Sequence, residues 1–237
     1  MTDSKQRRQQ LVTANRILAN EGIIQGFGHL SVRHPDGDKM LISRSLSPGL
    51  VTEDDVMTME FDGTIIDNDD DRPYLETVIH RAIYRNYDHV NAVVHHHAQQ
   101  IMPFAASNTD IKPVYHMGAL FHEGVPTFSS YDTDYGRMVV TEEEGERMAA
   151  TLGDSRAQLL ANHGANVVGA DLKEAVLGTM YLVTNAGLQF QAELLGEPNY
   201  YDGPEESLRA VVDDVILADI AIDRMWSFLS DRLPAER

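Results

Sequence analysis

Three histidines follow one another where a buried strand is expected to end. The stretch VNAVVHHH, residues 90–97, is an apolar run that leads into His95, His96 and His97. Because side chains alternate across a strand, His95 and His97 share one face and His96 points to the other. Two imidazoles on one face can both reach a single cation, at about 2.0–2.1 Å each. We therefore expect His95 and His97 to be ligands of one divalent metal ion.

A further histidine ends a second apolar strand later in the chain. It is His163, in the sequence LLANHGANVVG (159–169). A buried histidine with satisfied hydrogen bonds is the alternative interpretation of His163 when it is considered alone. The His-x-His pair and a His-Gly at another strand end together favour one shared site, in which three nitrogen ligands leave room for substrate. The chain has no cysteine, so every ligand must be a nitrogen or an oxygen atom.

Glu76 is the carboxylate expected beside these histidines. Pro73 marks the start of an amphipathic helix predicted over 74–87, which puts Glu76 in the first helical turn. The helix dipole favours an ionised carboxylate there. Glu76 is then either a fourth metal ligand or a base that exchanges protons with the substrate. An exposed glutamate paired with His80, one turn further on, is the alternative.

The elements that must position these residues follow from the apolar pattern. Helical spacing predicts helices at 5–21, 74–87, 142–152, 171–195 and about 206–231. Short apolar or alternating runs predict strands at 30–34, 40–43, 56–62, 90–97, 125–129, 158–160 and 166–168. The acidic stretch 67–71 is expected to be an exposed loop. There is no internal repeat or Pro/Gly/Ser linker, so residues 1–237 are predicted to form one domain, an α/β sheet with helices on both faces.

The composition limits which partners are expected. The chain has 37 acidic and 19 basic residues, which gives a formal net charge of −18. Such a surface repels phosphate backbones and argues against nucleic acid and anionic membranes as partners. An anionic substrate therefore needs a local basic site. No apolar run approaches the roughly eighteen residues of a membrane helix, and no signal-peptide core follows the first charges, so we expect a cytoplasmic protein.

From about residue 10 to 195 the sequence resembles the class II aldolase/adducin family. The motifs that carry the resemblance are GFGHLSV (26–32), LISRS (41–45), RPYLETVIH (72–80), AVVHHHA (92–98), PVYHMGA (113–119) and ANHGANVVG (161–169). The resemblance implies a three-layer α/β fold with a central, largely antiparallel sheet flanked by helices. It also implies a homotetramer with active sites at subunit interfaces. In this pattern His95, His97 and His163 bind the metal, and Glu76 is a ligand or an acid/base.

Three motifs depart from the sugar-phosphate aldolases of that family. Those enzymes usually carry Gly-Asn-x-Ser, Thr-Pro-x-Gly and Ser-Ser-Glu, whose small hydroxyls and amides cradle a phosphate. Here the matching stretches read GHLS (28–31), SRSL (43–46) and YLE (74–76). The planar, bidentate guanidinium of Arg44 suits a carboxylate instead. A surface-loop arginine is the alternative for Arg44.

The resemblance also indicates which other residues meet the substrate. The residues expected to bind substrate are His29, Ser43, Arg44, Ser45 and Tyr131. For Tyr131, stacking in the core is the alternative. The interface tyrosine that donates a proton in the aldolases matches His116 here, rather than Tyr115. His116 is therefore expected to be catalytic together with Glu76, and an unperturbed imidazole has a pKa near neutrality.

The altered motifs resemble the decarboxylase branch of the family, which acts on hydroxylated aromatic, pyridine or ring-cleavage dicarboxylic acids. We therefore expect a metal-dependent lyase that removes CO₂ from a small anionic carboxylic acid through a metal-stabilised enolate. Glu76, His116 or a bound water would then protonate the carbon. Three imidazoles and a carboxylate suit Zn²⁺ or Mn²⁺, and also Fe²⁺ or Co²⁺.

Two other functions fit parts of the same sequence. An aldolase, epimerase or dehydratase acting on a sugar or sugar phosphate would use the same metal ligands, but the phosphate cradle is altered in three motifs. A non-catalytic, adducin-like interaction module is the other alternative. Such a module would be expected to lose metal ligands, and all three histidines are present.

Overall fold

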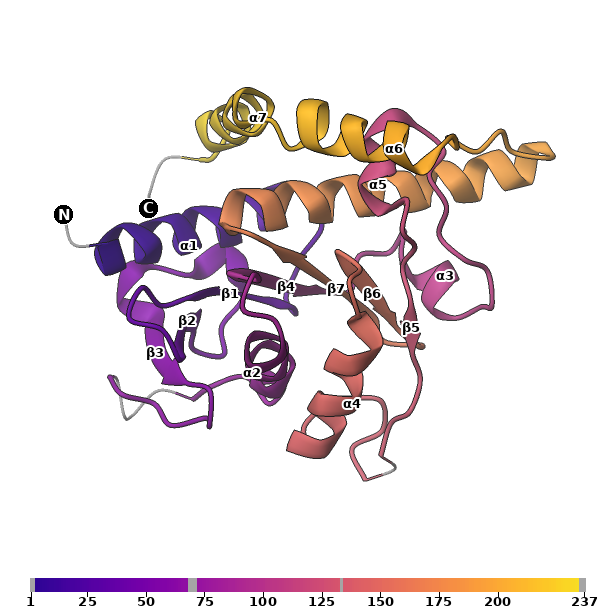
Figure 1. The fold of residues 1–237 in the computed structure, drawn as a ribbon. Coiled ribbons are helices and arrows are strands. Elements are labelled where there is room, and N and C mark those ends of the chain that lie inside the picture. Colours follow the sequence, from indigo (N-terminus) through magenta and orange to yellow (C-terminus); the bar gives the residue numbers. More distant parts are fainter. Residues whose placement is uncertain (1–2, 68–71, 133, 235–237) are drawn as a thin grey trace.

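The computed structural model describes residues 3–67, 72–132 and 134–234, which include a seven-stranded sheet (Figure 1). The strands are β1 (His29–Arg33), β2 (Lys39–Ser43), β3 (Val56–Glu60), β4 (Ala92–His96), β5 (Thr127–Phe128), β6 (Ala157–Leu160) and β7 (Gly164–Gly169). Their order is β3-β2-β1-β4-β7-β6-β5, and within this sheet only the β5–β6 pair is parallel. The prediction of a largely antiparallel central sheet is confirmed.

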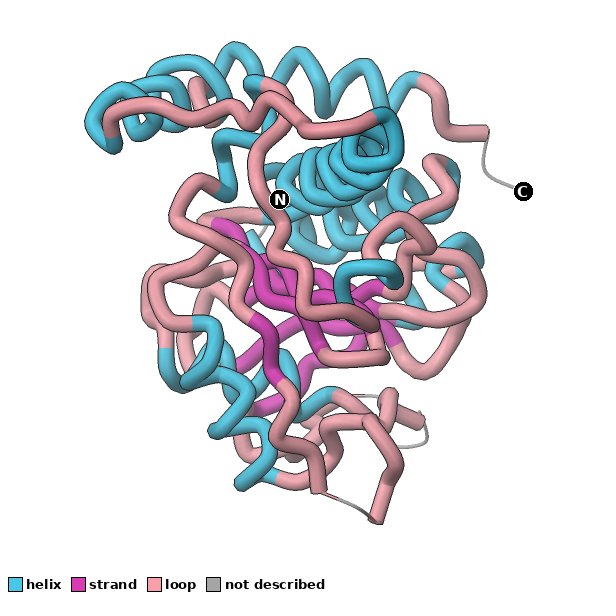
Figure 2. The backbone as a smooth tube through the Cα atoms, turned by 90° about the vertical axis from the view of Figure 1, so that its right-hand side faces the viewer, coloured by secondary structure: helices cyan, strands magenta, loops and turns pink. Residues whose placement is uncertain are grey.

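Helices cover both faces of the sheet and make three layers (Figures 1 and 2). The α-helices are α1 (Asp3–Asn20), α2 (Thr77–Asn86), α3 (Met102–Ala105), α4 (Glu142–Leu152), α5 (Leu172–Leu195), α6 (Glu205–Val211) and α7 (Asp219–Asp231). Short 3₁₀ helices are η1 (Pro48–Leu50), η2 (Glu53–Asp55) and η3 (His116–Phe121). Helices α1 and α5 lie on one face, with α6 and α7 outside them, whereas α2 and α4 lie on the other face.

Alternation along β4 divides the buried side chains between two cores. Ala92 and Val94 belong to the core that holds α1 and α5, and Val93 belongs to the core of α2 and α4. By the same alternation His95 points to the α2 side and His96 to the α5 side. Both histidine side chains are fully buried. Neighbouring histidines in the sequence therefore lie in different surroundings.

The prediction of a single C-terminal helix over 206–231 is wrong. Val212–Ile216 form a π-helical turn between α6 and α7, and Ala218 is extended, with φ −58° and ψ 133°. Val212 and Ile216 are buried in the core on the α5 side. The π-helical turn and the extended Ala218 interrupt the helix, and the chain then restarts as α7.

The helix predicted to begin at Pro73 begins at Thr77 instead. The cause is Tyr74, whose hydroxyl donates to the carbonyl oxygen of Leu46 at 2.7 Å. This bond holds the segment before α2 against the loop that follows β2, so it cannot wind into the helix. Glu76 consequently occupies the N-cap position of α2 and not its first turn.

The other predicted helices and strands are confirmed, with shifts of a few residues at their ends. Most of the acidic stretch predicted to be a loop, residues 68–71, lies outside the described residues. Within the part of the chain that is described, every helix is too short or too polar to span a lipid bilayer.

Candidate metal centre

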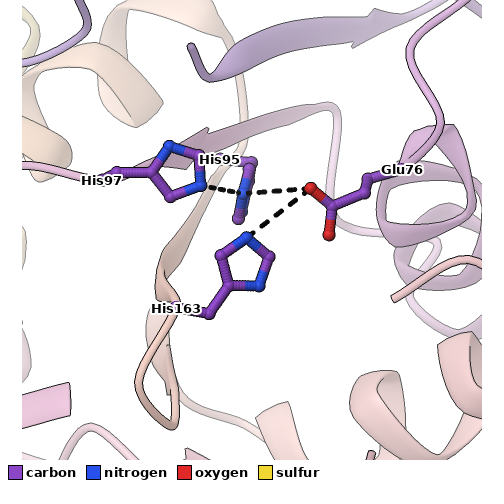
Figure 3. A group of neighbouring side chains, drawn as sticks. All are labelled: Glu76, His95, His97 and His163. Atoms are coloured by element: carbon purple, nitrogen blue, oxygen red, sulfur yellow. Dashed lines mark hydrogen bonds and ion pairs between the residues drawn. The ribbon is translucent and has the colours of Figure 1, made fainter. Parts of the chain in front are cut away.

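Four side chains that lie far apart in the sequence converge on the α2 side of the sheet (Figure 3). They are Glu76, His95, His97 and His163, and one ligand atom of each lies within 4.8 Å of all the others. His95 Nε2 is 3.0 Å from His97 Nε2. Glu76 Oε2 is 3.5 Å from His163 Nε2 and 3.9 Å from His95 Nε2. The structure thus brings together the residues expected to hold a metal.

The spacing of these atoms fits a single divalent cation. Ligand atoms about 2.0–2.1 Å from a tetrahedral centre lie about 3.3–3.4 Å from one another. The three separations of 3.0, 3.5 and 3.9 Å bracket that value, and all four ligand atoms lie within 4.8 Å of one another. Three imidazole nitrogens and one carboxylate oxygen are a donor set that Zn²⁺, Mn²⁺, Fe²⁺ and Co²⁺ accept. The residues present therefore fit the group that the family pattern implies.

A glycine allows the two histidine-bearing segments to approach each other. His163 lies in the turn between β6 and β7, and Gly164 follows it at the start of β7. A Cβ atom on Gly164 would lie 2.4 Å from the carbonyl oxygen of His96 and 2.8 Å from Cδ2 of His97. Those distances are well inside van der Waals contact, so only glycine lets this turn pass so close to the end of β4.

Asn166 holds the ring of His95 in place. The two residues face each other in the β4–β7 register, and His95 Nδ1 is 2.8 Å from Asn166 Oδ1. The Asn166 amide nitrogen donates to the sulfur of Met148, so its oxygen accepts the proton on His95 Nδ1. The lone pair of His95 therefore lies on Nε2, toward the other ligands. Such a partner behind a metal-binding histidine fixes both its tautomer and its orientation.

Asn166 is absent from the residues predicted from the sequence. A signal for it does exist, because it stands three positions after His163 in ANHGANVVG, on the strand that must lie beside β4 if the histidines meet. The strand register needed to pair it with His95 is set by packing, which the motif alone does not reveal.

Glu76 offers one oxygen to the cluster and uses the other to fix itself. Its side chain is buried, and Oε1 accepts the backbone N–H of Val139 at 3.0 Å. Oε2 is the atom that faces His95 and His163. Glu76 also occupies the N-cap position of α2.

Burial favours the neutral form of two of the proposed ligands, His95 and His97. It lowers the pKa of His95 well below its usual range, and the neighbouring His29, His163 and His97 lower it further. Burial also lowers the pKa of His97, together with His163 and against the opposing effect of Glu76. A metal binds the neutral form of an imidazole, so these rings are in the form that coordination requires.

His29 and Tyr74 stand beside the cluster. The centroid of the His29 ring is 4.9 Å from that of His95 and 4.6 Å from that of Tyr74. Gly28 makes this approach possible, since it has a φ of +108° and a Cβ there would lie 2.9 Å from the carbonyl oxygen of His95. Tyr74 is a further residue absent from the predicted site. Its role in fixing the neighbouring loop becomes visible only in the fold.

The loop after β2 carries the residues predicted to bind an anion. Arg44 Nε donates to Asp55 Oδ1 at 2.7 Å, and the Arg44 side chain is 41% exposed. Ser43 is buried, with its hydroxyl 3.0 Å from that of Tyr74, whereas Ser45 is exposed. Asp55 thus orients the guanidinium group of Arg44. Substrate binding by Arg44, Ser43 and Ser45 stays a prediction.

Two other predicted residues lie outside the cluster of four. His116 is exposed and begins η3, whose buried residues belong to the core on the α5 side. Tyr131 packs edge-on against Phe128, and its buried hydroxyl oxygen has no hydrogen-bond partner among the described residues. Burial raises the pKa of Tyr131 above that of a free phenol, so the phenol stays protonated. The functional roles of His116 and Tyr131 stay predictions.

The motifs that supply these residues match a known family. Residues 9–190 correspond to the Class II Aldolase and Adducin N-terminal domain. The chain belongs to this family. The resemblance inferred from the histidine, glutamate and glycine motifs is therefore confirmed.

Relatives of this class II aldolase family member include decarboxylases and aldolases. The decarboxylase tropJ of Talaromyces stipitatus is 29% identical over 194 residues, which cover 75% of this chain and 73% of that protein. The 3,4-dihydroxyphthalate decarboxylase of Arthrobacter keyseri is 27% identical over 206 residues, which cover 80% and 79% of the two chains. L-Fuculose phosphate aldolases are also among the relatives. The family and these relatives are lyases, which supports the same enzyme class for this chain.

The fold is that of the class II aldolases. The structure of L-fuculose 1-phosphate aldolase from Glaciozyma antarctica PI12 superposes with a TM-score of 0.81 and 23% identity, covering 98% of this chain and 89% of that one. The predicted fold class is confirmed. Because this fold occurs in an aldolase, it does not by itself separate decarboxylation from aldol cleavage.

Proposed function

We propose that this lyase decarboxylates a hydroxylated aromatic, pyridine or ring-cleavage carboxylic acid, using one divalent metal ion held by His95, His97 and His163. The observation that supports the proposal most is the convergence of three imidazole Nε2 atoms and the Glu76 carboxylate on one point. When bound, a divalent cation supplies a Lewis acid that takes up negative charge as a carbon–carbon bond breaks.

Glu76 is the proposed acid/base or fourth ligand within the chain. The backbone of Val139 holds its Oε1, so Oε2 keeps a fixed direction toward the substrate side of the histidines. After CO₂ departs, the substrate carbon must receive one proton. We assign this proton to Glu76 Oε2, to His116 or to a water molecule. His116 would act from a neighbouring subunit of a homotetramer, because it is exposed at the start of η3 and lies outside the cluster of four.

The residues around the cluster suit a planar acid with carboxylates. Arg44 presents a guanidinium group that Asp55 orients, and a planar fork of N–H donors matches a carboxylate. The half-buried ring of Tyr74 packs against His29 beside His95 and offers a flat surface for an aromatic or pyridine ring. The name of one relative, 3,4-dihydroxyphthalate decarboxylase, describes an aromatic dicarboxylate as its substrate and supports the same class here.

Aldol cleavage of a sugar phosphate is the second candidate, and the aldolases among the relatives support it. It would need a set of small donors around a phosphate. In place of such donors, the stretches 28–31, 43–46 and 74–76 carry His29 and Tyr74, and an arginine already paired with a carboxylate. We therefore favour decarboxylation.

The experiment that tests this proposal measures CO₂ release from hydroxylated aromatic and pyridine dicarboxylates, with and without added Mn²⁺ or Zn²⁺. We expect release that depends on metal, and no cleavage of L-fuculose 1-phosphate by the same preparation. Cleavage of the sugar phosphate without CO₂ release from any acid would favour the aldolase instead.

A pair of arginine variants sharpens the same experiment. Arg44→Ala should raise KM for a dicarboxylate by about tenfold, because a charge-assisted pair is worth roughly 1.5–3 kcal/mol. Arg147→Ala is the matched control, since Arg147 forms an exposed ion pair with Asp132 and should leave KM unchanged. If both variants keep the wild-type KM, Arg44 does not bind the substrate.

A further inference from the structure

Behind His29 runs a chain of hydrogen bonds formed by buried side chains of α2 and β1. The Tyr84 hydroxyl is 2.8 Å from Ser31 Oγ, Ser31 Oγ is 2.6 Å from His80 Nδ1, and His80 Nε2 is 2.6 Å from His29 Nδ1. His80 and Tyr84 lie one turn apart on α2, and His29 and Ser31 share one face of β1. All four side chains are at most 4% exposed.

The two ends of this chain of hydrogen bonds have different surroundings. At one end the Tyr84 phenol is enclosed in the core, and burial raises its pKa above that of a free phenol, so it keeps its proton. At the other end the ring of His29 lies 4.9 Å from that of the proposed ligand His95. His29 Nδ1 faces His80, and its second nitrogen, Nε2, is therefore turned away from α2.

The direction of the hydrogen bonds follows from counting hydrogens. Tyr84 has one hydrogen to give, and Ser31 Oγ is its side-chain acceptor among the described residues. Ser31 must then direct its own hydrogen to His80 Nδ1, so a neutral His80 carries its proton on Nε2 and donates to His29 Nδ1. Burial lowers the pKa of His80 to about 3, which keeps that ring at one proton. In the opposite direction the buried hydrogen of Tyr84 would lose Ser31 Oγ, its side-chain acceptor among the described residues, which is unfavourable.

We infer that the chain Tyr84–Ser31–His80 locks His29 in one tautomer, so that its Nε2–H is a permanent hydrogen-bond donor beside the metal cluster. His29 would be the group that touches substrate, and the other three are positioning residues. A neutral ring locked in this way donates without accepting. It therefore favours a substrate oxygen that only accepts, such as a carboxylate, over a hydroxyl that must donate. This preference rests on the proposed function, whereas the locked tautomer does not.

Neutron diffraction from crystals of the deuterated, Zn²⁺-treated protein tests the tautomer directly. We expect deuterium on Nε2 of both His29 and His80, and none on either Nδ1. The Tyr84 deuterium should point to Ser31 Oγ, and that of Ser31 to His80. Deuterium on Nδ1 of either ring would overturn the inference. This result does not depend on any substrate, so it stands whether or not decarboxylation is found.

The consequence for binding is tested with phthalate as the probe and the Zn²⁺-treated protein. Tyr84→Phe keeps the ring and removes the first hydrogen of the chain, so phthalate affinity should fall about fivefold, as for one neutral hydrogen bond. Tyr87→Phe is the matched control, because the Tyr87 hydroxyl donates to the Ala149 carbonyl oxygen and takes no part in this chain of hydrogen bonds. The phthalate affinity of Tyr87→Phe should be unchanged. Equal affinity in Tyr84→Phe and wild type would contradict the lock. If wild type itself does not bind phthalate, the proposed substrate class fails, and the neutron result still decides the tautomer.

Discussion

At the end of β4 the two faces of the sheet place a buried histidine in different surroundings. On the α2 side, His95 has a fixed partner in Asn166 and shares its surroundings with His97, His163 and Glu76. On the α5 side, His96 is equally buried, but its Nε2 has no hydrogen-bond partner among the described residues. Residue type and burial are the same on both sides. The difference lies in the neighbours that each strand face supplies.

This contrast shows how a site arises from ordinary packing. The α5 side joins β4 to apolar neighbours such as Val167 and Ala165, and His96 Nδ1 there accepts the backbone N–H of Ala98. The α2 side combines a strand end, a helix N-cap and a glycine-containing turn, which together put three imidazoles and a carboxylate within reach of one another. We therefore expect the role of a buried histidine at the end of β4 to depend on the face of the sheet that it occupies, and not on its residue type.

The largest effect is expected when the buried histidine on the α2 side is replaced and the result is compared with replacement of the one on the α5 side. His95→Ala should abolish metal uptake and turnover, since it removes a proposed ligand. His96→Gln should retain both and lower only the free energy of unfolding, by about 1–3 kcal/mol, as for other buried polar substitutions. Metal content by mass spectrometry and denaturant unfolding measure the two effects. A metal-binding His95→Ala protein, or a metal-free His96→Gln protein, would refute the assignment of faces.

A smaller effect should come from the residue behind His95. Asn166→Ala removes the acceptor of the His95 Nδ1 proton and leaves the four proposed ligands intact. Metal affinity should fall by about 10–100-fold, which is typical for the loss of such a partner. Competition with a chelator of known affinity measures it. Unchanged affinity would mean that packing alone orients His95.

Gly164 tests whether the close approach of the two segments is required. Gly164→Ala should lower the free energy of unfolding by about 1–3 kcal/mol, because the new Cβ would overlap the carbonyl oxygen of His96. Gly203→Ala is the matched control, since a Cβ there meets no atom within 4 Å. Thermal unfolding compares them, and equal stability of the two variants would show that the turn can move aside.

The smallest effect concerns pH and involves one histidine from each side of the sheet. Burial lowers the pKa of His80 and of His96 to about 3, whereas in the unfolded chain each ring titrates near 6.5. As the pH falls below about 6.5, these rings bind protons in the unfolded chain but not in the folded chain. The free energy of unfolding therefore decreases from about pH 6.5 toward about pH 3, by about 1.4 kcal/mol per pH unit for each ring. Urea unfolding of the metal-free protein at about pH 7 and pH 5.5 should show this, with a smaller decrease in His96→Gln. An equal decrease in that variant would contradict the assignment to His96.

The sequence predicts the proposed metal ligands better than it predicts the residues that orient the histidines. The alternation of a strand is enough to pair His95 with His97 and to set His96 apart, and the His-Gly at 163–164 indicates the third proposed ligand. By contrast, Asn166 and the chain from Tyr84 to His29 depend on which strand and helix lie side by side. That information comes from packing across the sheet, and single-sequence periodicity does not contain it.

Two local errors have the same origin. The apolar periodicity over 206–231 is continuous, but the helix divides at a π-helical turn whose Val212 and Ile216 are buried in the core on the α5 side. Pro73 is a sound signal for a helix start, yet the bond from Tyr74 to the loop after β2 delays that start to Thr77. In both places a tertiary contact overrides a correct local signal.

The most direct test of the account is anomalous X-ray diffraction from crystals soaked in Zn²⁺ or Mn²⁺, recorded at the absorption edge of the metal. We predict one strong peak per chain, bound by Nε2 of His95, His97 and His163 at about 2.0–2.2 Å and adjacent to Glu76 Oε2. A peak elsewhere, or none at these three rings at saturating metal, would contradict the central claim.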